Sequence, residues 1–485
     1  MKNQLRSAVL FYCCAFACAP ASAAVQTADA QAVRHETGRR LRLFERAWSQ
    51  TNDPAARRRA IAPLKQSVNQ FLGGRQLEAA RSLDAARFAL RSPDELPPAV
   101  RWAESLYAAL DRVLSDAATK ELSVTLDEFY KTDLSPPAGA QLVATVRNAD
   151  DQELTRLEVA IAQLPTNCAI STTGLGEGDF ELRLAIAAGG QSVAEGSYRF
   201  SLADRLPQRL EALEHATAGL DRSKDNVDGL SASAIAKLLG LLAKGEVLET
   251  DYPAARLLAE AEGAARAGGK GERFYEGKRG GQFWLRVAAG RTEIPVRIFV
   301  PTVARLGQPV PLVVALHGAG GSENLFFDGY GAGAIVDECE KRGWLLVSPR
   351  SAGFGLLPVE DLVTALEKIY PVQRDRVFMV GHSMGAMQAS AAAIANPAFY
   401  AAVAALGGGG AAKANVGLEG LPYFVAAGSE DFALSGARRL EKNLREAGVE
   451  RLLFREYPDV EHLLIVQEAL PDVFRFFDET AAKNR

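Results

Sequence analysis

The sequence Gly-His-Ser-Met-Gly at residues 381–385 carries the strongest chemical signal in the chain. It directly follows the apolar run 377–380 and precedes an alanine-rich segment, so the pattern predicts a serine in a sharp turn between a strand and a helix. Such a turn lifts the serine hydroxyl above the sheet, and glycines let strand and helix approach closely. The N-terminus of the helix then favours negative charge on a nearby substrate oxygen. Ser383 is therefore the predicted nucleophile.

A second glycine-rich sequence, His-Gly-Ala-Gly-Gly at residues 317–321, follows the apolar run 312–316. A serine nucleophile of this kind uses two backbone N–H groups to stabilise the oxyanion, one from the residue after the serine and one from a loop after another strand. The first donor is predicted to be Met384. The second is predicted to be Ala319, with Gly320 as the alternative, and His317 is expected to brace this loop rather than to move protons.

A general base and an acid that orients it are expected in the chain order serine, acid, histidine. Of the five histidines, only His462 follows Ser383, so His462 is the predicted base. Two carboxylates, Glu430 and Asp431, come after the strand-like run 423–427. We favour Asp431 as the acid, with Glu430 as the runner-up.

A third carboxylate, Asp459, is near His462 in the sequence, but its place on the loop that leads to His462 favours a role at the surface. No metal or organic cofactor is needed for chemistry of this type.

The elements that must position these residues are predicted for 272–485, where continuous apolar runs alternate with helical segments. Continuous runs are typical of parallel strands that are buried on both faces. The prediction is an α/β domain, with a mostly parallel sheet and helices on both faces. Active sites of such domains lie at the carboxyl ends of the strands.

Four further segments are predicted before this domain. Residues 24–137 are expected to be helical, because apolar residues such as Trp102, Leu106, Leu110 and Val113 recur at helical spacing. The alternation of apolar and polar residues after 138 predicts a small β-sandwich over 138–204. The remaining two segments are a helical connector over 205–271 and a signal peptide over 1–23.

The signal peptide is predicted from Lys2 and Arg6, the short apolar run 8–19 and the small residues at 21–23. It predicts export to the periplasm or the medium, and lipidation of Cys18 is a minor alternative. The run is too short to span a bilayer and no longer one follows, so stable membrane insertion is not expected. Cys168 and Cys339 fall in different predicted domains, which argues against a disulfide between them.

Composition excludes one class of partner. The hydrophobic fraction of 48% and the charged fraction of 24% are those of a globular protein. The formal net charge is −4, and no long basic run is present, so nucleic acid is not an expected partner.

Residues 281–480 resemble the α/β-hydrolase superfamily. The resemblance is carried by the turn around Ser383 at 381–385 (the elbow), by the glycine-rich loop at 317–321 and by the run 359–377, which leads from a helix into the strand before the elbow. The resemblance is greatest to bacterial extracellular esterases of the polyhydroxybutyrate-depolymerase and feruloyl-esterase type and to prolyl-oligopeptidase-like catalytic domains. It implies the same assignment: Ser383, Asp431 and His462 as a triad, with Ala319 and Met384 as oxyanion donors. Position 386 departs from many relatives, with alanine in place of a further glycine.

Three functions from different classes fit these observations. The favoured one is a secreted serine esterase that acts on a small-molecule or polymeric ester. The others are a serine peptidase with the same triad and a catalytically inactive binding protein. The segment 406–420 is short and glycine-rich, which argues against a mobile lipase lid, so the site is expected either to be open or to be covered by the N-terminal domains.

Overall fold

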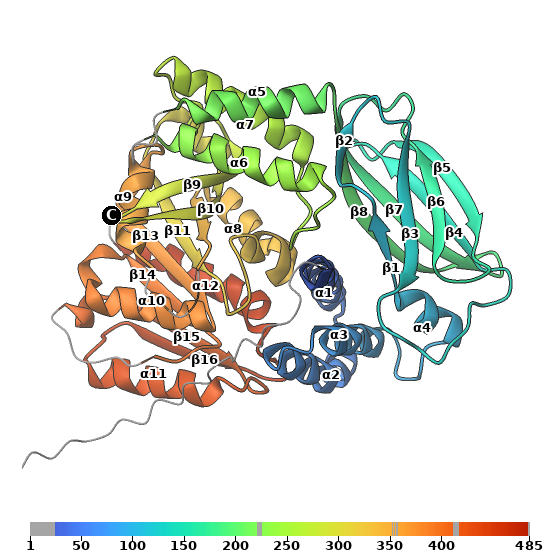
Figure 1. Ribbon diagram of the computed structural model, residues 1–485. Coiled ribbons are helices and arrows are strands. Elements are labelled where there is room, and N and C mark those ends of the chain that lie inside the picture. Colours follow the sequence, from blue (N-terminus) through green and yellow to red (C-terminus); the bar gives the residue numbers. More distant parts are fainter. Residues whose placement is uncertain are drawn as a thin grey trace, which may run out of the picture.

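The chain folds into a C-terminal α/β domain, a β-sandwich and two sets of helices that pack between and beside them (Figure 1). The computed structural model describes residues 25–220, 226–351, 353, 355, 357–410 and 417–483. The predicted signal peptide at 1–23 lies outside the described residues.

The C-terminal domain is built on an eight-stranded sheet with the order β16-β15-β14-β13-β11-β12-β10-β9. The strands from β11 to β16 pair in parallel, whereas β9 and β10 form an antiparallel edge. This confirms the predicted mostly parallel sheet. The strands are β9 (Gly281–Ala289), β10 (Thr292–Val300), β11 (Val310–Leu316), β12 (Leu345–Pro349), β13 (Val372–His382), β14 (Ala402–Leu406), β15 (Tyr423–Gly428) and β16 (Leu452–Tyr457).

Each face of this sheet packs against its own hydrophobic core. One strand contributes to both cores, because successive side chains point to opposite sides of the sheet. Along β11, Leu312 and Val314 belong to one core cluster and Val313 and Ala315 to the other. The first face is covered by α9 (Val359–Glu367), α10 (Met384–Ala395) and α11 (Leu434–Glu446). The second face is covered by α8 (Ala334–Arg342) and α12 (Ile465–Lys483).

The second face is also covered by helices from the start of the chain, which lie beside the C-terminal domain in Figure 1. Phe44, Ile61 and Leu83, one from each of the first three helices, share a core cluster with residues of α8 and α12. Polar contacts add to this packing, since Trp48 Nε1 donates to Glu468 Oε1 over 2.7 Å. These helices are α1 (Val25–Gln50), α2 (Pro54–Leu72) and α3 (Gln76–Arg91).

A buried glutamate, Glu45, lies where α1 meets the C-terminal domain. Its Oε2 accepts from the Gly331 N–H over 3.0 Å, and the side chain is fully buried. Burial raises the pKa of Glu45 to about 8, and the nearby Glu461 carboxylate adds to the shift. The folded chain therefore keeps this proton at pH values where the unfolded chain has lost it, so stability is fully present below pH 4.5 and falls as the pH rises toward 8.

We expect Glu45→Gln to remove this pH dependence, because glutamine keeps the shape but does not titrate. The Tm of the variant should exceed that of the wild type increasingly between pH 5 and pH 8, by about 5 °C at the upper end. Thermal unfolding followed by circular dichroism across this pH range measures the difference. The exposed Glu78→Gln on α3 is the control, and parallel Tm profiles for wild type and Glu45→Gln would contradict the prediction.

The β-sandwich is larger than predicted. Its two sheets have the strand orders β1-β3-β6 and β2-β8-β7-β4-β5, and their apolar faces meet in one core cluster. The strands are β1 (Leu106–Leu110), β2 (Leu114–Asp116), β3 (Glu121–Glu128), β4 (Gln141–Arg147), β5 (Glu153–Ala160), β6 (Thr166–Ser171), β7 (Gly178–Ala188) and β8 (Gln191–Ala203).

The prediction of a helix through Trp102 to Val113 was wrong. Helix α4 (Pro98–Glu104) ends before Leu106, where β1 begins and pairs antiparallel with β3. A spacing of four residues is one helical turn but also an even number, so Leu106 and Leu110 share a face in a strand as well. Short apolar patterns of this length do not separate the two structures.

The predicted helical connector is present as α5 (Leu206–Ala218), α6 (Val227–Ala243) and α7 (Ala254–Gly269), of which α6 and α7 extend the core under β9. Cys168 in β6 and Cys339 in α8 are buried free thiols. Within the described ranges, no helix combines the length and the apolar character that a membrane crossing requires.

Candidate active site

Ser383 lies in the turn between β13 and α10, as the sequence predicts, with φ 55° and ψ −112°. A non-glycine residue adopts a positive φ only where the surrounding structure enforces it. The elbow leaves no room for side chains on its glycines: a Cβ on Gly385 would lie 2.0 Å from the Leu316 carbonyl oxygen, and one on Gly381 would lie 2.2 Å from the Gly385 carbonyl oxygen. The two glycines therefore allow the close packing that presents Ser383.

The structure brings His462 and Asp431 together, 31 residues apart in the sequence. His462 Nδ1 is 2.8 Å from Asp431 Oδ1, and the side chains are 6% and 0% exposed. A buried carboxylate at Nδ1 holds the proton on that nitrogen, so Nε2 is left to accept a proton. Gly407, at φ 54°, lies against this pair, because a Cβ there would be 2.9 Å from Asp431 Oδ2.

The two other carboxylates considered from the sequence point elsewhere. Glu430 is 40% exposed and forms an ion pair of 3.0 Å with Lys65 of α2. Asp459 is half-exposed, and its carboxylate is 3.6 Å from Arg58. Neither is in contact with His462 in the manner of Asp431.

Backbone N–H groups at the two predicted oxyanion positions have no acceptor among the described residues. These are Ala319 in the loop after β11 and Met384 at the first position of α10. Gly320 shares this property, so it stays the alternative to Ala319. The loop is held by Arg34 of α1, whose Nη2 donates to the Gly320 carbonyl oxygen over 3.0 Å.

His317 braces this loop from within. Ser351 N–H donates to its Nε2 over 3.0 Å, so the proton is on Nδ1, which donates to the Gly318 carbonyl oxygen over 2.8 Å. Burial lowers the pKa of His317, which keeps the ring neutral. Among the described residues, no group of three or more His, Cys, Asp or Glu side chains is placed to hold a metal ion.

Sequence reasoning missed a hydrogen-bonded chain that joins the two loops of the site. His382 Nε2 is 2.9 Å from the His462 carbonyl oxygen, which only accepts, so Nε2 carries the proton. Its Nδ1 then accepts from the Tyr330 hydroxyl over 2.6 Å, and the Tyr330 oxygen accepts from the Gly318 N–H over 3.3 Å. Burial lowers the pKa of His382 well below its usual value, so the ring is neutral. This series of hydrogen bonds links the glycine-rich loop to the backbone of His462.

We expect Tyr330→Phe to lower kcat for an ester substrate about tenfold and to leave KM nearly unchanged, because it leaves the buried Gly318 N–H and His382 Nδ1 without partners. Steady-state kinetics and the rate of labelling by a fluorophosphonate measure the effect. Tyr370→Phe is the matched control, since the Tyr370 hydroxyl is buried without a partner among the described residues. Equal kinetics for both variants would contradict the positioning role of Tyr330.

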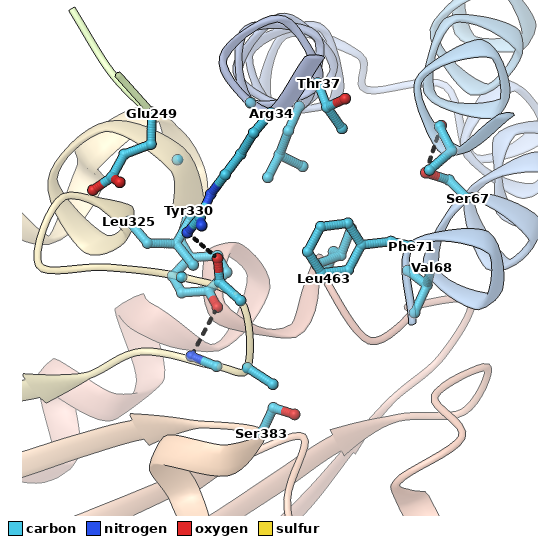
Figure 2. Close-up of a pocket in the computed structure, with 18 of the residues that line it drawn as sticks. Arg34, Thr37, Ser67, Val68, Phe71, Glu249, Leu325, Tyr330, Ser383 and Leu463 are labelled. Carbon is cyan, nitrogen blue, oxygen red and sulfur yellow. Dashed lines mark hydrogen bonds between the residues drawn. The ribbon is translucent and has the colours of Figure 1, made fainter. Parts of the chain in front are cut away.

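A cavity of about 180 Å³ opens above Ser383 and His462. Figure 2 shows Ser383 at its floor, with Arg34 of α1 and Phe71 of α2 facing it from the opposite side. The site is therefore roofed by N-terminal helices, one of the two arrangements that the sequence left open. No signal in the sequence identifies which helical residues lie here, because they are more than 300 residues from Ser383 along the chain.

Comparison with known proteins gave a family match and several similar solved structures. Residues 313–483 match the family described as "Alpha/beta hydrolase family". FphF, a fluorophosphonate-binding serine hydrolase of Staphylococcus aureus, is 14% identical and has a TM-score of 0.35, with 41% of this chain and 98% of that chain covered. A mutant feruloyl esterase module from Clostridium thermocellum, complexed with sinapinate, is 14% identical with a TM-score of 0.37, covering 41% and 88%. Est1E from Butyrivibrio proteoclasticus is 14% identical with a TM-score of 0.33, covering 42% and 99%.

No curated protein matches the sequence. The family match begins within β11 and ends within α12, so it takes in the elbow, the acid and the histidine. Residues 313–483 therefore match the α/β-hydrolase family, and the domain that contains them has the α/β-hydrolase fold.

Proposed function

We propose that the protein is a serine hydrolase that cleaves carboxylic esters through an acyl-enzyme. The observation that carries the proposal is the buried hydrogen bond of 2.8 Å between His462 Nδ1 and Asp431 Oδ1, in a site whose cavity also contains Ser383. A histidine oriented in this way is prepared to take a proton through Nε2. The strained backbone of Ser383 is typical of a nucleophile presented above a sheet.

In the first half of the reaction, Ser383 Oγ attacks the ester carbonyl carbon and gives its proton to His462 Nε2. The negative charge that forms on the carbonyl oxygen is stabilised by the N–H groups of Ala319 and Met384, each worth roughly 2.7–4 kcal/mol. The C–O bond to the alcohol then breaks, and His462 returns the proton to the departing alkoxide. Asp431 stays ionised and stabilises the imidazolium.

In the second half, water takes the place of Ser383 Oγ. Its oxygen attacks the acyl carbon while His462 accepts its proton, and the bond from the acyl group to Ser383 breaks. The proton passes to Ser383 Oγ, and a carboxylic acid is released. Every proton that leaves a nucleophile is returned to a leaving group, so no further reactant is required.

The proposal is tested by labelling the purified protein with a fluorophosphonate probe and locating the adduct by mass spectrometry. Labelling at Ser383, together with turnover of 4-nitrophenyl acetate and butyrate, is the expected result. Cleavage of proline-containing peptide amides with negligible ester turnover would establish a peptidase instead. A folded sample that neither labels nor turns over any substrate would favour a binding protein.

Export is part of the same proposal and rests on residues 1–23. The charged start, the short apolar run and the small residues at 21–23 are those that a signal peptidase recognises. The intact mass of protein recovered from the periplasm or the medium tests this. A mass that corresponds to a chain beginning at Ala24 is expected, whereas retention of residues 1–23 would contradict it.

A further inference from the structure

The cavity over Ser383 has two kinds of wall. Its floor comes from the α/β-hydrolase domain, with Ser383, His462 and the loop after β11. The opposite wall comes from α2 and α3, near the start of the chain, and its side chains include Val68, Phe71 and Leu83. The α/β-hydrolase domain by itself therefore forms only part of the space that a substrate enters.

The wall from α2 and α3 is largely apolar, and part of it is deeply buried. Val68, Ala79 and Leu83 are 6%, 1% and 3% exposed, and they lie where the two helices pack together. Phe71 is 37% exposed and Leu72 is 49% exposed, so these two side chains lie nearer to solvent, at the mouth. The apolar wall thus runs from exposed side chains at Phe71 and Leu72 to buried ones at Val68, Ala79 and Leu83.

Most polar side chains around the cavity are already paired with the protein; Gln76 of α3 is an exception, because its buried Oε1 has no hydrogen-bond partner among the described residues. The hydroxyls of Thr37 and Ser67 each donate to a backbone carbonyl oxygen over 2.8 Å, at Val33 and Ala79 respectively. The Thr250 hydroxyl donates to Asp328 over 3.0 Å. Groups that are satisfied in this way gain little from a polar substrate, and a polar substrate group would lose its hydration without compensation.

Most charged side chains of the cavity are also paired, although the exposed Arg34 has no carboxylate partner among the described residues. Arg34 donates to the Gly320 carbonyl oxygen, and Glu249 accepts from Arg350 over 2.6 Å. Arg42 faces the Asp251 carboxylate at 3.9 Å. The occupant that fits the wall formed by Val68, Phe71 and Leu83 is an uncharged, mainly apolar group.

The geometry of the reaction indicates which half of an ester lies against α2 and α3. His462 must protonate the departing alkoxide, so the alcohol half of the ester lies on the side of His462 and of Phe432, whose ring centroid is 4.2 Å from that of His462. The Phe71 ring instead rests on the glycine-rich loop, since a Cβ on Gly320 would lie 2.7 Å from Phe71 Cζ. An acyl group that extends away from His462 over this loop meets Phe71 first and Val68 behind it.

We propose that α2 and α3 form the acyl-binding wall of this enzyme, with Phe71 at the mouth and Val68 at the buried end, and that the substrates are esters of short to medium-length, uncharged apolar acids. This inference rests on the proposed function. A chamber of about 180 Å³ limits the length of the acyl group, and the wall supplies binding energy that grows with each methylene up to that limit.

The test uses the full chain, because α1 to α3 share a core with the α/β-hydrolase domain. 4-Nitrophenyl esters from acetate to decanoate report on the acyl side, and alkyl acetates from methyl to octyl report on the alcohol side. We expect Val68→Phe to fill the buried end and lower kcat/KM for the hexanoate roughly tenfold or more, while the value for the acetate changes less than about twofold. The optimum of the acyl series then moves to shorter chains, and the alkyl acetate series keeps its profile.

Phe71→Ala is the second variant, because Phe71 is partly exposed and its replacement does not disturb a core. It should lower kcat/KM for the butyrate and hexanoate about fivefold relative to the acetate, through loss of apolar contact. Leu77→Ala is the matched control, since Leu77 is an exposed residue of α3 that does not line the cavity. Thermal unfolding establishes that each variant is folded.

The outcomes separate this inference from the proposed function. If wild type hydrolyses the esters but the acyl profiles of Val68→Phe and Phe71→Ala match it, the acyl wall is wrong and the esterase stands. A change confined to the alkyl acetate series would place the alcohol against α2 and α3, which also overturns the inference. If wild type is neither labelled at Ser383 nor active on any ester, both proposals fail.

Discussion

Replacing Ser383 by alanine is expected to lower kcat for 4-nitrophenyl butyrate by five to six orders of magnitude, roughly the effect of removing the nucleophile from other enzymes of this mechanism. The reason is that no acyl-enzyme forms without Ser383 Oγ, and His462 then has no hydroxyl to activate. Initial rates at saturating substrate measure the loss, and the fluorophosphonate adduct should disappear with it. Alanine at this position removes only an oxygen, so the fold is expected to stay intact.

Ser390→Ala is the matched control for this experiment. Ser390 is a buried serine further along the same helix, α10, and it does not line the cavity. The control should keep wild-type rates within about twofold. If Ser383→Ala kept a tenth of the activity, the nucleophile would have to be another residue, and the central proposal would be wrong.

Replacing Asp431 by asparagine is expected to lower kcat about ten-thousandfold, because the amide no longer holds the proton on Nδ1 of His462. The Asp431 side chain is fully buried and 2.8 Å from that nitrogen, so water does not take its place. An asparagine that donates to Nδ1 would leave the proton on Nε2, the nitrogen that must accept it from Ser383. Steady-state kinetics on 4-nitrophenyl butyrate measure the loss, and circular dichroism establishes that the variant is folded.

Two controls distinguish Asp431 from its sequence neighbours. Glu430→Gln removes an exposed ion pair with Lys65, and Asp459→Asn removes one with Arg58. Exposed pairs of this kind contribute little, so both variants should keep kcat within about twofold. A large loss in Glu430→Gln with a small one in Asp431→Asn would exchange the roles of the two carboxylates.

Much of the α/β-hydrolase domain was predictable because its signals are local. Apolar runs of buried parallel strands are continuous in the sequence, and a strand, a glycine turn and a helix stand in order around Ser383. Asp431 and His462, the proposed acid and base, follow the ends of β15 and β16. Because parallel strands end on one edge of a sheet, side chains far apart in the sequence are brought together there. Chain order therefore indicated His462 and the adjacent carboxylates Glu430 and Asp431.

Prediction was weakest where a pattern had two structural solutions. Leu106 and Leu110 fit one face of a helix and one face of a strand equally well, and pairing of β1 with β3 decided between them. The choice between Glu430 and Asp431 had the same origin, since both follow β15. It depends on which carboxylate turns toward His462, and the structure places Asp431 there and Glu430 at the surface beside Lys65.

By itself the sequence determined the α/β fold of the C-terminal domain, the turn that contains Ser383 and the few residues proposed to act on an ester, because apolar runs and turn residues are local features of the sequence. Only the tertiary structure decided what surrounds them. The contact of Tyr330 with His382 and the wall from Phe71 and Val68 depend on packing between distant segments. Such packing is set by the shapes of two apolar surfaces that meet, and no spacing within either segment reports it.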